Sequence, residues 1–514
     1  MSSSPSFDRL VFFGDSLTDT GNTFELSSQN LIVPLPPESL GYEQRFSNGE
    51  VYADIVPRLL GIDNVDNFAF TAAASLGELS LGTILALNGV LGLQSPDADP
   101  TLLDFDINLN AQVDRFLDHP GNTDNSAASL FIGLNDFGQF VLANPEATPE
   151  EAIAFASNVA ESTLTAVDRL VDSGVETIIL NTLPVSSFFP SSTVQPPFPD
   201  EIIEIHNEAL LAGSAELTAS GVNVLVVDFA SIAREIAADP SAFGFVAPLS
   251  TFKFFGVGGN PDITKTSDGI VLSFPENPAS LENLDQQVFF DLVHPTTATH
   301  GIFAAFYSES LTSNVQILGS DNDRIKGSST DDLVLAGSGN DFVLLKDGDD
   351  VALGGLGNDR VFAASGDDII SLGSDHDLGF GGRGDDVIAG GVGNDTLVSG
   401  RGNDILIDGL GSDKVFGGSG DDMFVYSESS LLGGTGTSDR DLFFGGQGHD
   451  TLFLALTDTT RHEIEDSDDI FTSLTQLGIS THSIEDISFI ESPAELSTLE
   501  ADARIAEADL WGLI

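Results

Sequence analysis

The chain has 514 residues, more than one hydrophobic core usually serves, so two or three domains are expected. It carries 80 acidic and 18 basic side chains, and the formal net charge of −62 argues against nucleic acid and anionic membrane surfaces as attractors and favours bound cations. The absence of cysteine excludes disulfide bonds, a thiol nucleophile and cysteine-ligated zinc.

Short apolar runs recur along roughly the first 313 residues and alternate with helical patterns. Each run is almost continuously hydrophobic, which is typical of strands covered on both faces. The expected strands are Leu10–Gly14, Asn67–Phe70, Ser129–Gly133, Glu176–Leu180 and Asn223–Asp228. Strand–helix alternation of this kind predicts a parallel sheet with helices on both sides, in which ligands bind beyond the carboxyl ends of the strands.

Two of the helices have recognisable starts. Thr148 stands three residues before Glu151, so it is expected to cap a helix that ends near Gly174. Ser47 and Glu50 have the same spacing and predict a second capping box.

The first expected strand ends in Gly14-Asp15-Ser16, directly before a polar helix start. Ser16 is therefore either the N-cap of that helix or a nucleophile at the tip of a strand. A serine attacks only where a base takes its proton and donors stabilise the oxyanion, so the same domain must supply these groups.

One of the four histidines in this half has an acid nearby in a non-helical context. Asp291 precedes His294 by three residues, and Pro295 biases His294 away from helix. A turn of this length can fold the carboxylate back onto the imidazole, although Asp291 could equally be a turn residue. Asn135, which follows the third expected strand, either points its amide into the same cleft or forms an Asx-turn.

In combination these segments resemble the GDSL (SGNH) hydrolases over about residues 7–310. The resemblance rests on six blocks in order: FGDSLTDTGN, RFSNG, NFAFTAAAS, FIGLNDFG, NTLP and DLVHPTTATH. It implies a three-layer α/β/α sandwich and ester hydrolysis through an acyl-enzyme, with Ser16 as nucleophile, His294 as general base and Asp291 as the acid that orients it. It also implies an oxyanion hole formed by the Ser16 amide, the Asn135 side chain and one further backbone N–H.

The second block departs from the family pattern. Ala72 stands where the family has a glycine whose N–H is the last oxyanion donor. Ala72 still has an N–H, so the donor survives unless its backbone conformation requires glycine. A misplaced donor costs about 2.7–4 kcal/mol of barrier, so we expect reduced activity at most.

An apolar segment, Leu76–Leu93, follows the second block. The longest weakly charged stretch of the chain, Leu79–Gln94, overlaps it; this stretch is glycine-rich and lacks the roughly 20 strongly apolar residues of a membrane span, so no transmembrane segment is expected. The segment Leu76–Leu93 either forms a lid or lines an acyl pocket, or it is a plain core helix.

After about residue 318, aspartate recurs every nine residues, usually with glycine two positions before it and an apolar residue two positions after it. Aspartates in strict register argue against a flexible linker. Stacked units of this kind bury a narrow core and align carboxylates with glycine carbonyls, a donor set that suits Ca²⁺. Because bare carboxylates repel, folding and metal binding are expected to be coupled. The expected ligands are Asp323, Asp332, Asp341, Asp350, Asp359, Asp368, Asp377, Asp386, Asp395, Asp404, Asp413, Asp422 and, one residue out of step, Asp450.

Residues 319–454 resemble the RTX family, whose repeat is G-G-x-G-x-D-x-U-x. The resemblance implies a parallel β-roll with several structural Ca²⁺ ions between successive turns. It also implies export by type I secretion (ABC transporter) machinery that recognises an uncleaved C-terminal signal, and hence an extracellular location. The first expected strand begins near Arg9, which leaves no room for a cleaved signal peptide and fits that route.

Three parts are therefore expected: a hydrolase domain at 1–314, a calcium-binding roll at 315–456 and an acidic tail at 457–514 that includes the secretion signal. The favoured function is a secreted serine esterase or lipase that cleaves carboxylic esters, with a lipid as one candidate substrate. A polysaccharide acetylesterase and a phospholipase are alternatives of the same class. The alternative from another class is a non-catalytic calcium-binding adhesin or surface-layer protein.

Overall fold

The structure is a computed structural model with two compact units, one formed by residues 4–234 and 247–311 and the other by 1–3, 235–246 and 312–514. It describes residues 7–28, 42–77, 104–144, 146–190, 200–238, 294–428, 440–465 and 470–490, with short segments at 35–36, 80, 82, 240–243, 245, 262–266, 269–273 and 287–289. No helix among these residues is long and apolar enough to cross a membrane.

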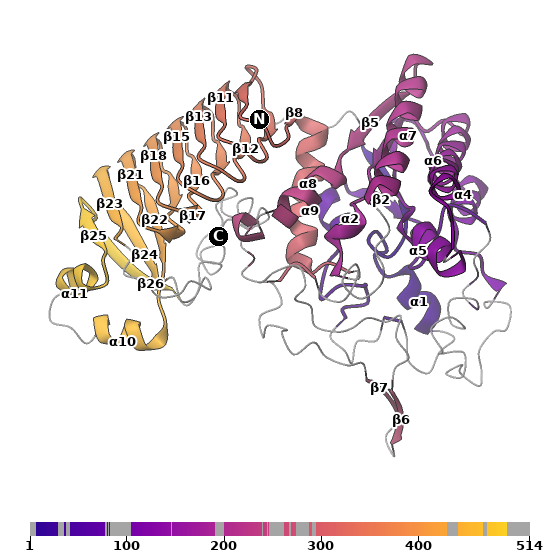
Figure 1. The fold of residues 1–514 in the computed structure, drawn as a ribbon, viewed down its shortest axis with the longest axis horizontal. Helices are drawn as coiled ribbons and strands as arrows, with labels where there is room; N and C mark the ends of the chain where they lie inside the picture. The colour runs from indigo at the N-terminus through magenta and orange to yellow at the C-terminus, as the bar shows by residue number, and fades with distance from the viewer. Residues whose placement is uncertain are drawn as a thin grey trace. The chain divides into compact units, whose positions relative to one another are not determined.

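A five-stranded sheet forms the centre of the first unit (Figure 1). Its strands run in the order β2-β1-β3-β4-β5, and every neighbouring pair is parallel. In this order the direction of winding reverses next to β1, so the carboxyl end of β1 lies at the crevice where such sheets bind ligands. The strands are β1 (Arg9–Gly14), β2 (Asn64–Asn67), β3 (Ser126–Phe131), β4 (Thr177–Asn181) and β5 (Asn223–Val227).

Helices cover both faces of this sheet, which confirms the three-layer α/β/α architecture. One core cluster joins β1, β3 and β4 to α4, α6 and α7. On the other face Tyr52 of α2 packs edge-on against Phe131 of β3 and Phe229 of α8, and Phe303 of α9 packs against Phe229. The helices of the chain up to residue 312 are α1 (Asn22–Ser28), α2 (Tyr52–Leu59), α4 (Leu109–Asp118), α5 (Leu134–Ala143), α6 (Pro149–Asp172), α7 (Asp200–Ala219), α8 (Phe229–Ala238) and α9 (Thr297–Thr312).

Several smaller elements complete this part of the chain. They are the single turns η4 (Ser186–Phe188) and η6 (Pro240–Phe243) and the antiparallel hairpin of β6 (Asp262–Thr266) and β7 (Gly269–Ser273).

Local sequence signals were right for one helix start and wrong for another. The hydroxyl of Thr148 caps α6 by accepting from the Glu151 N–H, as the capping box predicts. The predicted box at Ser47 is wrong, because α2 begins at Tyr52 and Val51 is its N-cap. The Ser47 hydroxyl instead donates to the Pro295 carbonyl, 3.0 Å away and far along the chain.

The second strand also differs from its prediction. It covers Asn64–Asn67, and the apolar run that follows it is no longer part of the strand. After Asn67 the N–H groups of Phe68 and Phe70 still donate to carbonyls of β1, so the run stays beside the strand end that carries Ser16.

The second unit contains a roll of two parallel sheets, whose strands stack as a ladder in Figure 1. Partner residues lie 18 apart, as in Leu333 and Val351 or Val343 and Val361, so two nonapeptides form one turn. Alternate repeats therefore belong to different sheets, and their inward side chains form one narrow apolar core. This arrangement confirms the predicted β-roll.

The nine-stranded sheet contains β8 (Asn314–Ile317), β10 (Asp332–Leu335), β12 (Val351–Leu353), β14 (Ile369–Ser371), β16 (Val387–Ala389), β19 (Ile405–Ile407), β22 (Met423–Ser427), β24 (Thr451–Ala455) and β26 (Asp486–Ile490). The eight-stranded sheet contains β9 (Arg324–Lys326), β11 (Phe342–Asp347), β13 (Arg360–Ser365), β15 (Leu378–Arg383), β18 (Thr396–Arg401), β21 (Lys414–Ser419), β23 (Leu442–Gln447) and β25 (Ser480–His482). A short pair, β17 (Val392–Gly393) and β20 (Leu410–Gly411), lies at the turns.

The segment after residue 456 takes part in the roll. Its helices α10 (Asp458–Glu465) and α11 (Ile470–Gln476) lead into β25 and β26, which extend the two sheets by one strand each. Ile464 and Leu474 of these helices belong to the apolar core of the roll. Residues 491–514 lie outside the described part of the chain.

Candidate active site

Ser16 and His294 lie 278 residues apart in the sequence and are in contact in the structure. The Nε2 atom of His294 is 3.0 Å from the Ser16 hydroxyl, and each residue is 8% exposed. Ser16 lies in the turn after β1, in which the N–H groups of Thr18 and Asp19 donate to the Asp15 carbonyl. The imidazole is therefore placed to accept a proton from the hydroxyl.

The end of β1 has little space around it. A Cβ atom at Gly14 would lie 2.6 Å from both the Phe131 carbonyl oxygen and the Thr18 hydroxyl. The Gln112 amide bridges the strand end, because it accepts from the Gly14 N–H and donates to the Gly14 carbonyl. These contacts fix the backbone from which Ser16 projects.

The RFSNG block holds the segment that carries His294. Ser47 donates to the Pro295 carbonyl, and the Asn48 side chain accepts from the Thr297 N–H at 2.8 Å. The ring of Phe46 packs against the His294 imidazole with centroids 5.0 Å apart. The sequence pattern predicts a helix cap in part of this block, whereas in the structure the block supports the imidazole.

Residues on either side of His294 in the sequence pair with each other. Phe289 and Pro295 form an antiparallel bridge, and the Thr296 N–H donates to the Val288 carbonyl at 3.0 Å. Asp291 lies outside the described residues.

Asn135 lies in the first turn of α5, at the same edge of the sheet as Ser16. Its amide nitrogen donates to the Ala73 carbonyl at 3.0 Å and lies 3.4 Å from Oδ2 of Asp15. The first contact ties Asn135 to the loop that contains Ala72. Ala72 has φ = 58°, in the left-handed region that favours glycine.

Two buried carboxylates hold these loops together, and sequence analysis did not single them out. Asp19 accepts from the N–H groups of Gly21, Asn22, Thr23 and Thr71, and therefore joins the Ser16 loop to the Ala72 loop. The two residues are Asp19, in the FGDSLTDTGN block, and Asp136, in the FIGLNDFG block, and these positions are the only sign of their role in the sequence.

Asp136 joins α5 to the segment that follows the Ala72 loop. It accepts from the N–H groups of Ser75 and Leu76 at 2.7 and 2.9 Å. Burial raises the pKa of Asp136 to about 6, although these hydrogen bonds lower it. Burial likewise raises the pKa of Asp15 to about 7, against the opposing effects of the Leu17 N–H and His294.

Two other buried histidines serve as neutral packing groups. His300 accepts from the Tyr52 N–H through Nδ1, and burial lowers its pKa to about 3. His206 packs edge-on against Phe137, and burial lowers its pKa to about 4.

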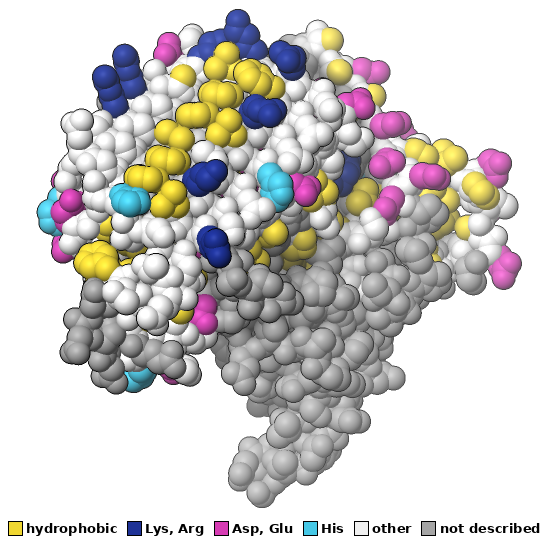
Figure 2. Space-filling view, turned by 60° about the vertical axis from the view of Figure 1, so that its left-hand side comes forward, with side chains coloured by type: hydrophobic (Ala, Val, Ile, Leu, Met, Phe, Trp, Pro, Cys, Tyr) yellow, Lys and Arg dark blue, Asp and Glu magenta, His cyan; other side chains and the backbone are white. Residues whose placement is uncertain are grey.

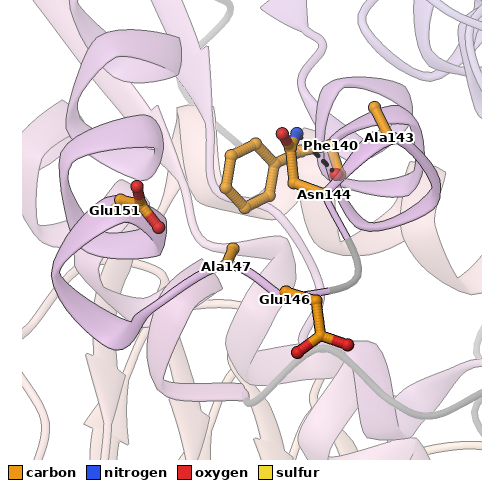
Figure 3. Close-up of a pocket in the computed structure, with 6 residues that line it drawn as sticks. All are labelled: Phe140, Ala143, Asn144, Glu146, Ala147 and Glu151. Atoms are coloured by element: carbon orange, nitrogen blue, oxygen red, sulfur yellow. Dashed lines mark hydrogen bonds between the residues drawn. The ribbon is translucent and has the colours of Figure 1, made fainter.

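A surface pocket near the end of α5 is separate from the serine–histidine pair. It contains none of the predicted site residues. Its lining consists of Phe140, Ala143, Asn144, Glu146, Ala147 and Glu151, as Figure 3 shows.

The repeat aspartates form hydrogen-bonded ladders along the roll. Along the ladders the N–H of one aspartate donates to Oδ1 of the aspartate one turn further on, as in Asp332 to Asp350 and Asp341 to Asp359, at 2.7–3.0 Å, whereas the N–H of Asp450 donates to Glu485. The second oxygen, Oδ2, is buried and has no hydrogen-bond partner in Asp341, Asp350, Asp359, Asp368, Asp377, Asp386, Asp395, Asp422 and Asp450. Rows of unsatisfied carboxylate oxygens fit hard cations such as Ca²⁺.

The aspartates of the ladders are hard to ionise in the absence of metal. Burial, aided by the charges of the neighbouring ladder aspartates, raises the pKa of Asp368 and Asp377 to about 8 and that of Asp386 to about 9.

The structure also explains why Asp450 is out of step with the nine-residue spacing. Its Oδ1 accepts from the Asp422 N–H, so 28 residues amount to one turn of 18 plus an insertion of ten. Asp441, which sequence analysis missed, is the ladder partner of Asp413.

A parallel sheet with helices on both faces and a serine–histidine pair at its carboxyl edge define an α/β protein of the serine-hydrolase type. The GDSL-like lipase/acylhydrolase family matches residues 10–306, and the chain belongs to this family. Its second unit carries RTX calcium-binding nonapeptide repeats, which match in five stretches between residues 317 and 456.

Several known proteins are similar to part of the chain. A phosphatidylcholine-sterol acyltransferase of Aeromonas hydrophila is 27% identical over 344 residues, which cover 60% of this chain and 92% of that protein. A thermolabile hemolysin of Vibrio parahaemolyticus is 26% identical over 59% of this chain and 63% of its own length. An Arabidopsis thaliana protein named as an inactive GDSL esterase/lipase-like protein is 26% identical over 41% of this chain and 52% of its own length.

Proposed function

We propose that the chain is a secreted serine hydrolase that cleaves carboxylic esters through an acyl-enzyme. The observation that carries the proposal is the 3.0 Å contact between the Ser16 hydroxyl and Nε2 of His294 at the carboxyl edge of the sheet. His294 takes the proton as Ser16 attacks the ester carbonyl, and then returns it to the leaving alcohol. Water, activated by the same imidazole, releases the acid.

Asp291 is assigned as the residue that orients His294. The bridge between Phe289 and Pro295 supports this assignment, because Asp291 and His294 both lie in the short stretch of sequence between these two paired residues. The Ser16 and Ala72 N–H groups and the Asn135 amide are assigned to the oxyanion hole. The hydrogen bond from Asn135 to the Ala73 carbonyl supports this assignment, because the bond keeps the amide beside the Ala72 loop.

Lipid esters are the substrate class we favour. The support is the likeness to a phosphatidylcholine-sterol acyltransferase, whose name refers to a phospholipid donor and a sterol acceptor. The same likeness makes acyl transfer to an alcohol a second candidate activity. The proposed lid or acyl-pocket segment, 76–93, lies largely outside the described residues.

The roll is assigned a structural role that depends on several Ca²⁺ ions, held by the ladder aspartates. Export by type I secretion machinery, folding on meeting external calcium, and a signal within 457–514 complete the proposal. The RTX repeats and the rows of unsatisfied Oδ2 atoms support the calcium assignment.

The test compares the wild-type chain with Ser16→Ala on p-nitrophenyl esters of increasing chain length, with and without a sterol acceptor. Ser28→Ala is the control, because Ser28 is an exposed serine in α1. We expect Ser16→Ala to lose at least about a thousandfold in rate and Ser28→Ala to keep full activity. Equal background rates in all three proteins would favour the non-catalytic adhesin instead.

A further inference from the structure

Asp408 occupies a turn position at which no other described repeat has a charged residue. It stands five residues before the ladder aspartate Asp413. The corresponding residues of the other described repeats are small or apolar: Leu318, Gly327, Ala336, Leu345, Gly354, Ala363, Leu372, Gly381, Gly390, Ser399, Gly417 and Gly445.

A side chain at this position points at the ladder carboxylate that follows. A Cβ atom added to Gly381, Gly417 or Gly445 would fall directly against Oδ2 of the next ladder aspartate. Asp408 fills this space with a carboxyl group and is 1% exposed. Its Oδ1 accepts from the Gly409 N–H, whereas its buried Oδ2 has no hydrogen-bond partner.

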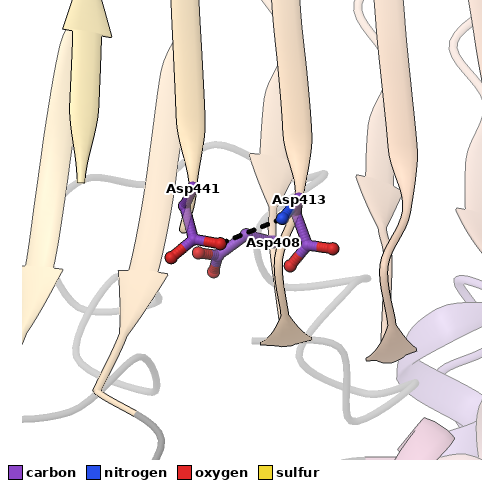
Figure 4. A group of neighbouring side chains, drawn as sticks. All are labelled: Asp408, Asp413 and Asp441. Carbon is purple, nitrogen blue, oxygen red and sulfur yellow. Dashed lines mark hydrogen bonds between the residues drawn. The ribbon is translucent and has the colours of Figure 1, made fainter. Parts of the chain in front are cut away.

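Three carboxylates meet here from three different strands. Asp408 follows β19, Asp413 precedes β21 and Asp441 precedes β23, and Figure 4 shows them side by side. One oxygen of each lies within 4.8 Å of the others, and all three residues are buried. Asp441 follows Asp413 by 28 residues instead of 18, so the additional carboxylate lies where the regular spacing of the repeat is interrupted.

We propose that Asp408, Asp413 and Asp441 together bind one hard divalent cation, through a three-carboxylate set that the other described turns lack. Three buried negative charges with an unsatisfied oxygen are unfavourable alone, and a cation both neutralises them and completes the coordination of that oxygen. Affinity of oxygen-ligand sites rises with the number of charged ligands, so this site retains its ion at lower free calcium than the other turns.

The test is calcium retention by the full-length chain, dialysed against a chelator of intermediate affinity and analysed by atomic emission. Asp408→Asn keeps the shape of the side chain and removes its charge, and Asp347→Asn removes one exposed charge from the same roll. We expect Asp408→Asn to retain one calcium fewer per chain, with at least about tenfold weaker binding at that site. Asp347→Asn should retain as much as the wild type.

Equal retention by Asp408→Asn and the wild type would overturn the proposal and make Asp408 a protonated, structural acid. Asp408→Gly restores the residue most common at this position and serves as a second variant if Asp408→Asn does not fold at saturating calcium. Loss of one ion in Asp408→Gly, with an otherwise unchanged circular dichroism spectrum, supports the site.

A second feature, the outer face of the eight-stranded sheet, carries an independent inference. Its strands contain seven basic residues and one acidic residue, in a chain with a net charge of −62. Figure 2 shows a band of hydrophobic side chains with lysine and arginine beside it. The basic residues are Arg324, Lys326, Lys346, Arg360, Arg383, Arg401 and Lys414.

The band consists mainly of stacked phenylalanines. Phe362 and Phe380 stack with centroids 4.9 Å apart and planes 8° apart, and Phe416 and Phe444 repeat this geometry at 4.9 Å and 4°. All four side chains are partly exposed. Aromatic rings flanked by cations suit the boundary between anionic headgroups and acyl chains.

We infer that this face docks on an anionic lipid surface. The whole-chain charge predicted the opposite, but charges farther than a Debye length of about 8 Å are screened, so the local basic face decides the contact. The inference does not depend on ester hydrolysis, because binding is measured in the Ser16→Ala background.

Sedimentation with phosphatidylcholine vesicles, with and without phosphatidylglycerol, tests it at saturating calcium. Replacing Arg383 and Arg401 by Gln should weaken binding to the anionic vesicles at least about tenfold, whereas Arg58→Gln in the other unit should not. Equal binding by all variants, or binding to a sulfated polysaccharide but not to vesicles, would overturn it.

Discussion

At the scale of single residues, the site depends on backbone positions more than on unusual side chains. Ser16, His294 and Asn135 are ordinary residues whose positions follow from neighbours that tolerate little change. Gly14 has no space for a Cβ atom, and Ala72 adopts a conformation that alanine disfavours. Exchanging glycine and alanine is therefore expected to have opposite effects on stability at these two positions.

Replacing Ala72 by Gly should stabilise the first unit by about 0.5–1 kcal/mol. A left-handed alanine costs about 1–2 kcal/mol, and the greater freedom of glycine in the unfolded chain offsets part of the gain. Urea unfolding followed by circular dichroism measures the change in the free energy of unfolding. Ala73→Gly is the control, because Ala73 is fully buried without a positive φ and should lose stability. Equal destabilisation by both would contradict the strain argument.

Replacing Gly14 by Ala should destabilise the first unit by about 1–3 kcal/mol and lower esterase activity, because the strand end and the Ser16 turn must shift. Gly138→Ala is a matched control: it lies inside α5 with open space around it and should be neutral or stabilising by up to about 1 kcal/mol. Thermal unfolding and initial rates measured together separate the two variants. A tolerated Gly14→Ala would show that the strand end can relax.

At the scale of elements, the strands and their parallel arrangement follow from the sequence, whereas the contacts between loops do not. Continuous apolar runs predict buried strands, and four of the five lie close to their predicted positions. The hydrogen bonds from Ser47 to Pro295 and from Thr71 to Asp19 join segments that are distant in sequence, and no local pattern encodes them. Asp441 was hidden for another reason, because an insertion separates it from its ladder.

The ladders predict how the metal-free roll responds to pH. Ladder aspartates with pKa values raised to about 7–9 bind more protons when folded than when unfolded, so stability falls as pH rises from about 4 to 9. Chelated protein should therefore melt at a higher temperature at pH 5 than at pH 8. Saturating calcium should remove this trend, because the cation replaces the protons. A metal-free roll that becomes more stable as the pH rises would contradict the raised pKa values of the ladder aspartates.

At the scale of the whole molecule, two separate apolar cores predict two unfolding transitions. One core belongs to the α/β unit and the other to the roll, and among the described residues the rows of unsatisfied carboxylate oxygens occur in the roll alone. Chelation should lower or abolish one calorimetric transition and leave the other in place. Residual ester hydrolysis should follow the calcium-independent transition. A single transition that moves as a whole with calcium would show that the units unfold together.

The 18-residue turn has a consequence for how the roll is built. The N–H of a ladder aspartate donates to the carboxylate one turn further along, so a finished turn is a template on which the next can be laid. Growth needs only the adjacent turn and its ions, and assembly can advance stepwise from a single ordered nucleus.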